Sequence, residues 1–570
     1  MTPVDDLLIT PASLNAIPPF PSLQHSGFLY LASRNCVAET ANDENQVSRC
    51  PTSREEPKQE LPSSAQAAFA RNMVPPPWDS VPARDTSFVL VTGANSGIGL
   101  GICQRLIDEF LATRSLTSHL VVIPTTRSAR KSAETIALLR RHLHRTASSS
   151  SSKLRARGAA PGGALARVHI TSVQLDLCDF ASVRRAADRL LGGTLALEGH
   201  GEVRIPRLDA VVLNAGIGGW TGLDWPRAAH NLFTAGWVQA TTWPTFKAAD
   251  PGLVTNPLPG PSADGDAESS SPMGMVFCAN VFGHYLLAHA ILPLLSRRRG
   301  DEDEDVPPGR IIWESSLEAT GEHFSRDDFQ AVRSRAAYES TKRLTDLLCL
   351  TADLPSVRAH ALSYWEEPSS SGDGSERTRR KEEEEDEVVA KAGEEAAAVQ
   401  KPRVYLCHPG IVVTTIFPLP LILFYAYKFA MYVTRWLGSP WHTNTSYNAA
   451  ASMVWLALAA QGTLDGAGAG RVKWGSACDF WGSSTVKETE VDGWGWRGEV
   501  EDLDGGDEDD DGAARVLRKI TGRKRGAEVV TEEKRAEFEE MGASCWREME
   551  RLRGEWEARI EKTVASNGHA

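Results

Sequence analysis

Short apolar runs alternate with segments of helical periodicity along most of the chain from residue 86 onward. The runs are rich in Val, Ile and Leu without regular polar alternation, which is typical of strands buried on both faces. The predicted strands are residues 88–92, 120–123, 168–175, 208–213, 310–314 and 404–407. The predicted helices are residues 98–111, 131–142, 180–191, 275–295 and 335–350. This alternation predicts an α/β fold with a doubly wound, Rossmann-type parallel sheet covered by helices on both faces.

Polar segments interrupt and flank this pattern. We expect one domain over residues 86–482, because loops tolerate added length at little cost in free energy. Its low-complexity inserts are at about residues 146–161, 251–272 and 368–399. Residues 1–85, rich in Pro, Ser and Ala, are predicted to be a disordered N-terminal extension. Residues 483–570 are predicted to be an acidic tail with a charged helix at 532–562, either solvated or bound to a partner, and we favour the solvated form.

Composition and charge narrow the class of protein. Hydrophobic residues make up 42% of the 570 residues, an ordinary share for a globular protein. The formal net charge of −13 argues against a nucleic-acid partner. Nine cysteines are scattered without a Cys-x-x-Cys pair, so we predict no disulfide framework and no metal site, and we expect a reducing compartment. No charged segment followed by an apolar run opens the chain, so no signal peptide is predicted.

A glycine-rich segment joins the first predicted strand to the first predicted helix, as in turns that bind the pyrophosphate of a dinucleotide. We predict that Gly93 permits the tight turn and that Gly97 lets the backbone approach the pyrophosphate. Gly99 allows the helix to pack closely on the strand. The free N–H groups at the helix start would face the phosphates. The predicted cofactor contacts of this turn are Gly93, Asn95, Ser96, Gly97, Ile98 and Gly99.

The end of the second predicted strand indicates which cofactor is bound. NAD enzymes usually place an acidic residue here for the ribose 2′-hydroxyl, whereas an arginine suits the 2′-phosphate of NADPH. The sequence Thr125-Thr126-Arg127-Ser128 contains no acid and one arginine. We therefore predict NADPH, with Arg127 on its phosphate. The alternative is that Arg127, with Arg130 and Lys131, forms only a solvated basic helix start.

Polar residues also end the following strands, at the edge where open parallel sheets bind ligands. Asp176 ends the third strand, Asn214 the fourth, and Ser315-Ser316 the fifth. Asn280 lies within an otherwise apolar predicted helix. A buried amide costs free energy unless it is paired, so we expect Asn280 to have a hydrogen-bond partner.

Tyr338 and Lys342 lie four residues apart on a predicted helix and therefore project from the same face. An ammonium group near a phenol favours the phenolate, so we predict that the pKa of Tyr338 falls below its usual value of about 10. Such a tyrosine can donate a proton to a carbonyl oxygen during hydride delivery and take it back in the reverse reaction. The order of glycine-rich turn, asparagine, serine and Tyr-x-x-x-Lys predicts a carbonyl-reducing enzyme.

Together these motifs resemble the short-chain dehydrogenases/reductases, over residues 86–482. The resemblance implies that Asn280 holds a proton-relay water and that Ser316, with Ser315 as the alternative, orients the carbonyl. It implies that Tyr338 is the acid/base and that Lys342 binds the nicotinamide ribose and lowers the pKa of the tyrosine. The further cofactor contacts that it implies are Asp176, Asn214, Tyr338, Lys342, Pro409, Gly410 and Thr414, with Thr415 as the alternative to Thr414.

Four segments resemble a narrower branch, the fungal 3-keto-steroid reductases of ergosterol biosynthesis. They are residues 313–319, 327–330, 338–348 and 473–482. The resemblance implies NADPH-dependent reduction of a sterol 3-ketone to the 3β-alcohol during C-4 demethylation, beside the other demethylation enzymes. It places the activity at the cytoplasmic face of the endoplasmic reticulum membrane, or on lipid droplets. The alternatives are a reductase of another apolar carbonyl compound and an inactive nucleotide-binding scaffold of a sterol-enzyme complex.

An apolar segment, residues 416–437, follows the sixth predicted strand. Pro418, Pro420 and Lys428 interrupt it, which disfavours a membrane-spanning helix. It could line a sterol pocket, lie in a membrane interface, or be ordinary core. We expect a pocket wall or an interface helix, with monotopic attachment to the membrane.

Overall fold

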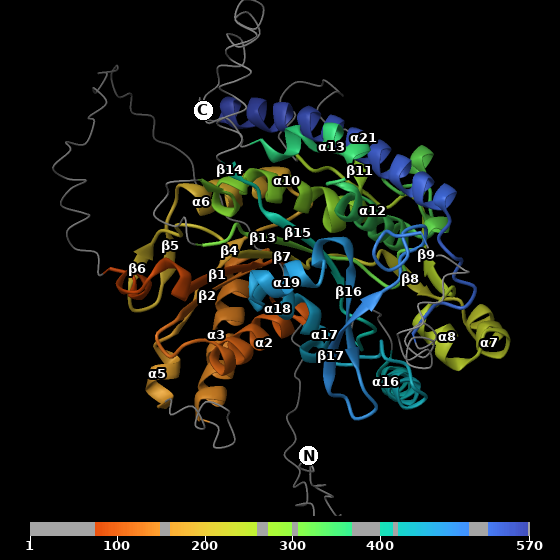
Figure 1. Ribbon diagram of the computed structural model, residues 1–570, viewed down its shortest axis with the longest axis horizontal. Helices are drawn as coiled ribbons and strands as arrows, with labels where there is room; N and C mark the ends of the chain where they lie inside the picture. Colours follow the sequence, from red (N-terminus) through yellow and green to blue (C-terminus); the bar gives the residue numbers. More distant parts are fainter. Residues whose placement is uncertain are drawn as a thin grey trace, which may run out of the picture. The chain divides into compact units, whose positions relative to one another are not determined.

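The computed structural model describes residues 75–148, 160–258, 272–298, 306–366, 399–413, 420–500 and 522–567. Most of the predicted N-terminal extension and of the predicted inserts lies outside these ranges, as do the predicted cofactor contact Thr414 and its alternative Thr415. Within the described ranges, helices enclose a central sheet (Figure 1).

Nine strands of the described residues form this sheet, in the order β17-β16-β15-β13-β7-β1-β2-β3, with β4 also beside β2. The pairs are parallel except for β16 with β17, which are antiparallel. The strands are β1 Thr86–Val91, β2 His119–Thr126, β3 Val168–Ile170, β4 Val173–Gln174, β7 Ala210–Leu213, β13 Arg310–Glu314, β15 Arg403–His408, β16 Lys473–Cys478 and β17 Ser484–Thr489. The chain runs outward from β1 in one direction and then in the other, which confirms the predicted doubly wound sheet.

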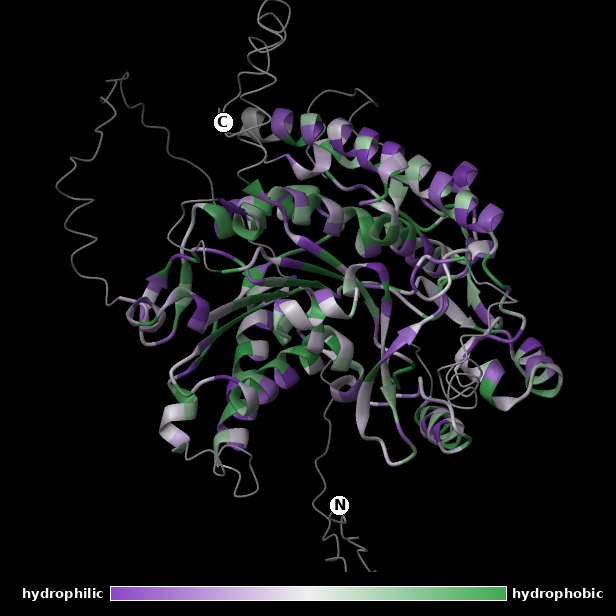
Figure 2. Cartoon of the chain, viewed as in Figure 1, coloured by the Kyte–Doolittle hydropathy of each residue, from purple (hydrophilic) through white to green (hydrophobic). Residues whose placement is uncertain are grey.

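Helices cover the two faces of the sheet and enclose a separate apolar core on each side. The first face carries α2 Gly97–Thr113, α3 Ala129–Ser148, α17 Ser446–Ala449 and α18 Ala451–Leu458. The second face carries α6 Phe180–Leu191, α10 Gly283–Ala290 and α12 Ala337–Thr351. Figure 2 shows the hydrophobic strands in the middle and hydrophilic positions on the outer helices. α6 has the predicted bounds because Asp179 accepts a hydrogen bond from the Ser182 N–H, a typical N-cap.

The predicted helix at 275–295 is interrupted. It comprises α9 Met275–Phe277, a π-helical turn η4 Cys278–Phe282, α10, and α11 Leu292–Leu295. The π turn contains Asn280, whose side chain bonds to the backbone of a neighbouring segment, and such turns are frequent at functional sites. The predicted third strand is likewise split, into β3 and β4.

The C-terminal region belongs to the same core, so the favoured prediction of a solvated helix is wrong. α21 Glu532–Asn567 packs on α12, α6 and α13 Pro355–Ala361 (Figure 1). Its buried residues recur every three or four positions, as expected for one face of a helix. They are Phe538, Cys545, Trp546, Met549, Leu552, Trp556 and Ile560. The abundant charged residues of this segment lie on the other face of α21. Because they dominate its composition, the composition alone did not indicate the buried apolar face.

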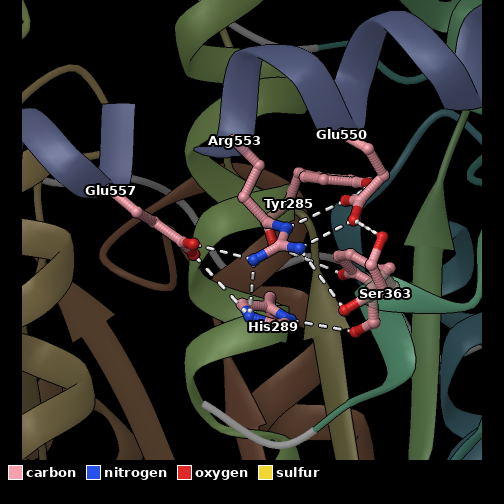
Figure 3. A network of polar contacts seen from close by, with 7 residues as sticks. Tyr285, His289, Ser363, Glu550, Arg553 and Glu557 are labelled. Carbon is pink, nitrogen blue, oxygen red and sulfur yellow. Dashed lines mark hydrogen bonds and ion pairs between the residues drawn. The ribbon is translucent and has the colours of Figure 1, made fainter. Parts of the chain in front are cut away.

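A polar network also holds α21 in place (Figure 3). Arg553 donates to the carboxylates of Glu550 and Glu557, and Tyr285 donates to Glu550 over 2.6 Å. His289 of α10 lies 3.0 Å from Arg553. Burial, together with the Arg553 charge, lowers the pKa of His289 to about 4, so this histidine is neutral at pH 7. The network therefore joins α21 to α10 without a buried unpaired charge.

Residues 217–258 form a lobe beside the carboxyl edge of the sheet, where the sequence predicted no element. It contains β8 Trp220–Leu223, α7 Trp225–Thr234, α8 Trp237–Thr242 and β9 Lys247–Ala249. β8 and β9 are antiparallel partners. The remaining helices and strands are α5 Pro161–Leu165, β5 Leu195–Leu197, β6 Gly201–Val203, β10 Val254–Thr255, β11 Met273–Gly274, β12 Arg297–Arg298, β14 Val399–Gln400 and α19 Gln461–Gly466.

The apolar segment after β15 forms α16 Leu421–Trp436, which contacts α8. Trp237 of α8 donates a hydrogen bond to Thr434 over 3.0 Å. Many apolar residues of α16 are exposed, including Ile422 at 83%, so the interpretation as ordinary core is wrong for the described part. No helix in the described ranges combines the length and the apolar character needed to cross a bilayer.

Candidate active site

The glycine-rich turn between β1 and α2 has the geometry that a dinucleotide requires. Gly93 has a φ of +65°, and a Cβ there would lie 2.8 Å from the Cβ of Ala215. Gly97 has a φ of +54° and open space where a Cβ would stand. A Cβ on Gly99 would lie 2.6 Å from Nδ2 of Asn214. These positions fit a tight turn, a close backbone approach and close helix packing, respectively.

The start of α2 is open to a ligand. Ser96 is the N-cap residue, and its side chain makes no capping hydrogen bond. Asn95 instead donates to the Ser96 hydroxyl over 3.3 Å, and Ile98 packs partly into the core. The first N–H groups of α2, with the positive end of the helix dipole, can therefore bind a pyrophosphate.

The residues expected to meet the adenosine end of a dinucleotide follow β2 and β4. Arg127 is exposed and, within the described part of the chain, makes no ion pair. Arg130 pairs with Glu134 one helical turn away at 2.8 Å, so it is already occupied. Asp176 accepts a hydrogen bond from the Cys178 N–H over 3.0 Å. The groups present fit a dinucleotide, with Arg127 available for a 2′-phosphate.

Thr92 and His284 join the cofactor turn to the helix of Asn280, a connection that the sequence analysis missed. The Thr92 hydroxyl accepts hydrogen bonds from the Asn214 and Ala215 N–H groups at 2.9 and 3.0 Å, and lies 2.9 Å from Nε2 of His284. Nδ1 of His284 lies 3.3 Å from the Asn280 carbonyl oxygen. Burial lowers the pKa of His284 to about 3, so it is neutral. The sequence feature that could have identified His284 is its position four residues after Asn280 in an otherwise apolar helix.

Asn280 has the partners that its burial requires. Its amide exchanges two hydrogen bonds with the backbone of Ile217, at 2.8 and 3.0 Å. It also donates to the Thr341 hydroxyl over 3.2 Å, and Thr341 donates to the carbonyl oxygen of Tyr338. The expectation of a paired amide is confirmed, and the pairing connects Asn280 to the helix of Tyr338.

Of the two serines that follow β13, Ser316 faces the tyrosine. The Ser316 side chain lies close enough to Tyr338 to lower the pKa of the phenol, and its hydroxyl accepts a hydrogen bond from the Glu318 N–H over 3.2 Å. Ser315 is buried and donates to the Asp346 carboxylate over 2.5 Å. Asp346 also accepts from Lys473 of β16, which the sequence analysis missed. The geometry therefore favours Ser316 over Ser315 as the group that orients a carbonyl, with Ser315 part of the support beneath it.

The phenol of Tyr338 is less acidic in this structure than predicted. Burial and the nearby Glu318 carboxylate raise the pKa of Tyr338, and the Ser316 hydroxyl opposes the increase. Lys342 lies 5.7 Å from the centre of the phenol ring. Its ammonium group donates to the Glu314 carbonyl oxygen over 2.6 Å, and its own burial lowers the pKa of Lys342. The prediction of a lowered tyrosine pKa is wrong here, because the desolvation of the phenolate outweighs the ammonium group.

A second lysine, Lys247, lies near Tyr338 and comes from the lobe of residues 217–258. Lys247 of β9 lies 5.3 Å from the centre of the Tyr338 ring and 4.1 Å from that of Trp220. It forms ion pairs with Glu318 and with Glu339, the latter at 3.2 Å. Nothing in the local sequence marks Lys247, since it is an isolated lysine in a segment without a recognisable pattern.

Pro409 and Gly410 follow β15 at the same edge of the sheet. Gly410 has a φ of +72°, and a Cβ there would lie 2.4 Å from the carbonyl oxygen of Trp441. The Gly410 N–H donates to His408 over 3.1 Å. These contacts hold the turn tightly in place.

Comparisons with known proteins give two fungal relatives of high similarity. The chain is 47% identical over 489 residues to the 3-keto-steroid reductase of Gibberella zeae, covering 84% of this chain and 96% of that protein. It is 43% identical over 491 residues to the 3-keto-steroid reductase of Aspergillus fumigatus, with the same coverages of 84% and 96%. No family model matches the chain. Among solved structures, a 3-oxoacyl-[acyl-carrier protein] reductase from Brucella melitensis in complex with NAD has a TM-score of 0.33 and 15% identity, over 67% of this chain and 93% of that chain.

Proposed function

This chain belongs to the 3-keto-steroid reductases, a branch of the short-chain dehydrogenases/reductases, and on that basis we propose that it reduces a sterol 3-ketone to the 3β-alcohol with NADPH. The sterol is an intermediate of C-4 demethylation in ergosterol biosynthesis. The observation that carries the proposal is the meeting of Ser316, Tyr338 and Lys342 at the carboxyl edge of the sheet, next to the glycine-rich turn.

The reaction needs a hydride at C3 and a proton on the ketone oxygen. The bound nicotinamide supplies the hydride. The hydroxyl groups of Ser316 and Tyr338 hold the ketone oxygen, and Tyr338 gives it a proton as the carbon is reduced. The Ser316 hydroxyl, which lowers the pKa of the phenol, and the Lys342 ammonium group stabilise the phenolate that forms. Tyr338 then regains its proton from solvent.

The NADPH part of the proposal is supported by Arg127 and by the missing acid after β2. An arginine binds a 2′-phosphate through charge-assisted hydrogen bonds, whereas an acidic residue there would repel the phosphate. Arg127 is exposed at the strand end and available for such a contact.

Two other functions are less well supported. A reductase of another apolar carbonyl compound would use the same site, but both relatives are 3-keto-steroid reductases, which favours the steroid. An inactive nucleotide-binding scaffold has no need for a serine and a lysine grouped beside a buried tyrosine.

The proposal includes attachment to the cytoplasmic face of the endoplasmic reticulum membrane or of lipid droplets, close to the other demethylation enzymes. A sterol is held mainly in lipid, so a site that opens at a lipid surface avoids transfer through water. The surface of α16 carries exposed Leu421, Ile422 and Phe429, and Trp481 at 85% exposure follows β16. Each apolar side chain buried in lipid contributes roughly 1.5–3 kcal/mol, so a few are sufficient for binding.

One assay separates the catalytic alternatives. Purified enzyme is incubated with NADPH and either a 3-keto sterol or an unrelated apolar ketone, and NADPH oxidation and sterol product are measured. Faster turnover of the sterol supports the proposal. Preference for the other ketone supports the second function, and NADPH binding without turnover supports the scaffold.

Fractionation tests the attachment. The wild-type protein should sediment with membranes, whereas Ile422→Glu/Phe429→Glu should release folded protein that still binds NADPH. Leu116→Glu, at another exposed apolar residue, is the matched control and should sediment like the wild type. Wild-type protein that stays wholly in the supernatant would refute the attachment.

A further inference from the structure

The lobe of residues 217–258 reaches the catalytic tyrosine through two side chains. Trp220 of β8 lies with its ring centre 4.8 Å from that of Tyr338. The ammonium group of Lys247 in β9 lies over both rings, 4.1 Å from the Trp220 ring centre and 5.3 Å from that of Tyr338. Leu223 and Lys247 are paired in the β8–β9 ladder, so this antiparallel strand pair fixes both contacts.

Two carboxylates share the Lys247 ammonium group. Glu318 lies two residues after Ser316, and Glu339 directly follows Tyr338. The side chain of Lys247 is 8% exposed, and those of both glutamates are 11% exposed. Solvent therefore screens this cluster poorly, and two carboxylates without the lysine would repel each other and the nearby phenolate.

Resting on the proposed function, we propose that Lys247 is a positioning residue of this site, whose charge offsets Glu318 and Glu339 beside Tyr338 and so allows the phenol to release its proton. Lys342 is the other cation near the phenol, at 5.7 Å from the ring centre, but its ammonium group is held by the Glu314 carbonyl oxygen. Lys247 is at least as close, and its electrostatic effect on the phenolate is of the same sign.

The charged groups around this cluster come from several elements. Burial raises the pKa of Glu318 to about 7, with Lys247 acting against the increase. Burial raises the pKa of Glu314 to about 8, and the charge of Lys342 acts against this increase. Burial, together with the Glu318 charge, raises the pKa of Tyr427 in α16 to about 12. The Glu318 carboxylate is thus paired with Lys247 and acts on the phenols of Tyr338 and Tyr427.

The test measures the ionisation of Tyr338 directly, without a substrate. Phenolate absorbance is recorded against pH for the NADP⁺ complex of each variant. The absorbance of the same variant that also carries Tyr338→Phe is subtracted, so that the difference reports the ionisation of Tyr338 alone. Lys247→Met should shift the midpoint to higher pH by roughly 1–3 units, as expected on loss of a cation at this range. Lys247→Arg should restore most of the wild-type midpoint. Lys247→Met/Glu318→Gln, which removes a cation and an anion together, should also return it towards wild type.

The kinetic arm follows oxidation of a 3β-hydroxy sterol with NADP⁺, which needs the phenolate. In Lys247→Met the alkaline rise of kcat should shift by the same amount, and kcat near neutral pH should fall by roughly tenfold or more, with KM little changed. Lys401→Met, which breaks an exposed ion pair with Asp353, is the control. An unshifted midpoint, or a shift that neither rescue variant reverses, would overturn the role of Lys247. A wild type that does not turn over the sterol would overturn the proposed function while the absorbance titration still decides the role of Lys247.

Discussion

The ammonium group of Lys473 lies 2.6 Å from the carboxylate of Asp346, in the layer directly beneath the candidate active site. The lysine side chain is 3% exposed, and that of the aspartate is fully buried. Lys473 also donates to the Ser316 carbonyl oxygen over 2.7 Å, and Asp346 accepts from Ser315. This ion pair therefore joins β16, α12 and the serine turn at one point.

Removing one partner of this pair should be severely destabilising. Lys473→Met leaves a buried carboxylate without its cation, and we expect a loss of about 3–5 kcal/mol in the free energy of unfolding. Urea denaturation measures it. Lys473→Met/Asp346→Leu should recover much of that loss, because no unpaired charge remains. Arg184→Met, which breaks the exposed pair with Asp188, should cost less than about 1 kcal/mol.

Tyr338→Phe should retain the fold and cofactor binding but lose roughly 10²–10⁴-fold in kcat, because the ring remains and the proton donor is gone. Single-turnover reduction of a 3-keto sterol and fluorescence titration with NADPH measure the two properties. Tyr425→Phe changes an exposed tyrosine of α16 and serves as the control. Near-normal turnover by Tyr338→Phe would contradict the assignment of the acid.

Arg127→Ala should weaken NADPH binding and leave NADH binding nearly unchanged. A hydrogen bond to a charged group contributes about 1.5–3 kcal/mol, so the preference should fall by roughly 10- to 100-fold. Dissociation constants for both cofactors give the ratio. Arg130→Ala is the matched control, since Arg130 already pairs with Glu134. A wild type that binds both cofactors equally would refute the predicted preference.

The stability of the protein should fall as the pH drops below about 6.5. The folded pKa of His284 is about 3, below its ordinary value, so protonation favours the unfolded state. Stability from this group is complete above the unfolded pKa and is lost between there and pH 3, amounting to roughly 2 kcal/mol at pH 5. His284→Gln should show a shallower decline between pH 7 and pH 5 in denaturation experiments. His230→Gln, at an exposed histidine, should show the wild-type slope.

The central strands and the glycine-rich turn could be predicted because their patterns are local. β13 and α6 have the predicted bounds, and the predicted polar residues Asp176, Asn214 and Ser315-Ser316 follow β4, β7 and β13. A strand buried on both faces, or a glycine with positive φ, can be recognised from the types of a few adjacent residues. The order of these local patterns along the chain was sufficient to indicate the fold and the position of Ser316, Tyr338 and Lys342.

The missed features depend on contacts between residues distant in sequence. Lys247 meets Glu318 and Glu339 only because the lobe folds back over the site, and neither partner is within 70 positions of it in sequence. The prediction about the Tyr338 pKa failed for a related reason. Helical spacing gives the proximity of Lys342, but burial and the Glu318 carboxylate are properties of the whole fold. Likewise, the sequence of α21 does not indicate which surface its apolar face contacts, because that surface is formed by α12 and α13 in the folded protein.

The position of α21 has a consequence for biosynthesis. The outer face of α12 is completed by a helix that follows every other described element in the chain. At about 5–20 residues per second, α12 leaves the ribosome on the order of ten seconds or more before α21 is available. During that interval the apolar surface that Trp546 and Trp556 later cover has no helix over it. The helix of Tyr338 therefore reaches its final packing only after translation has passed residue 560.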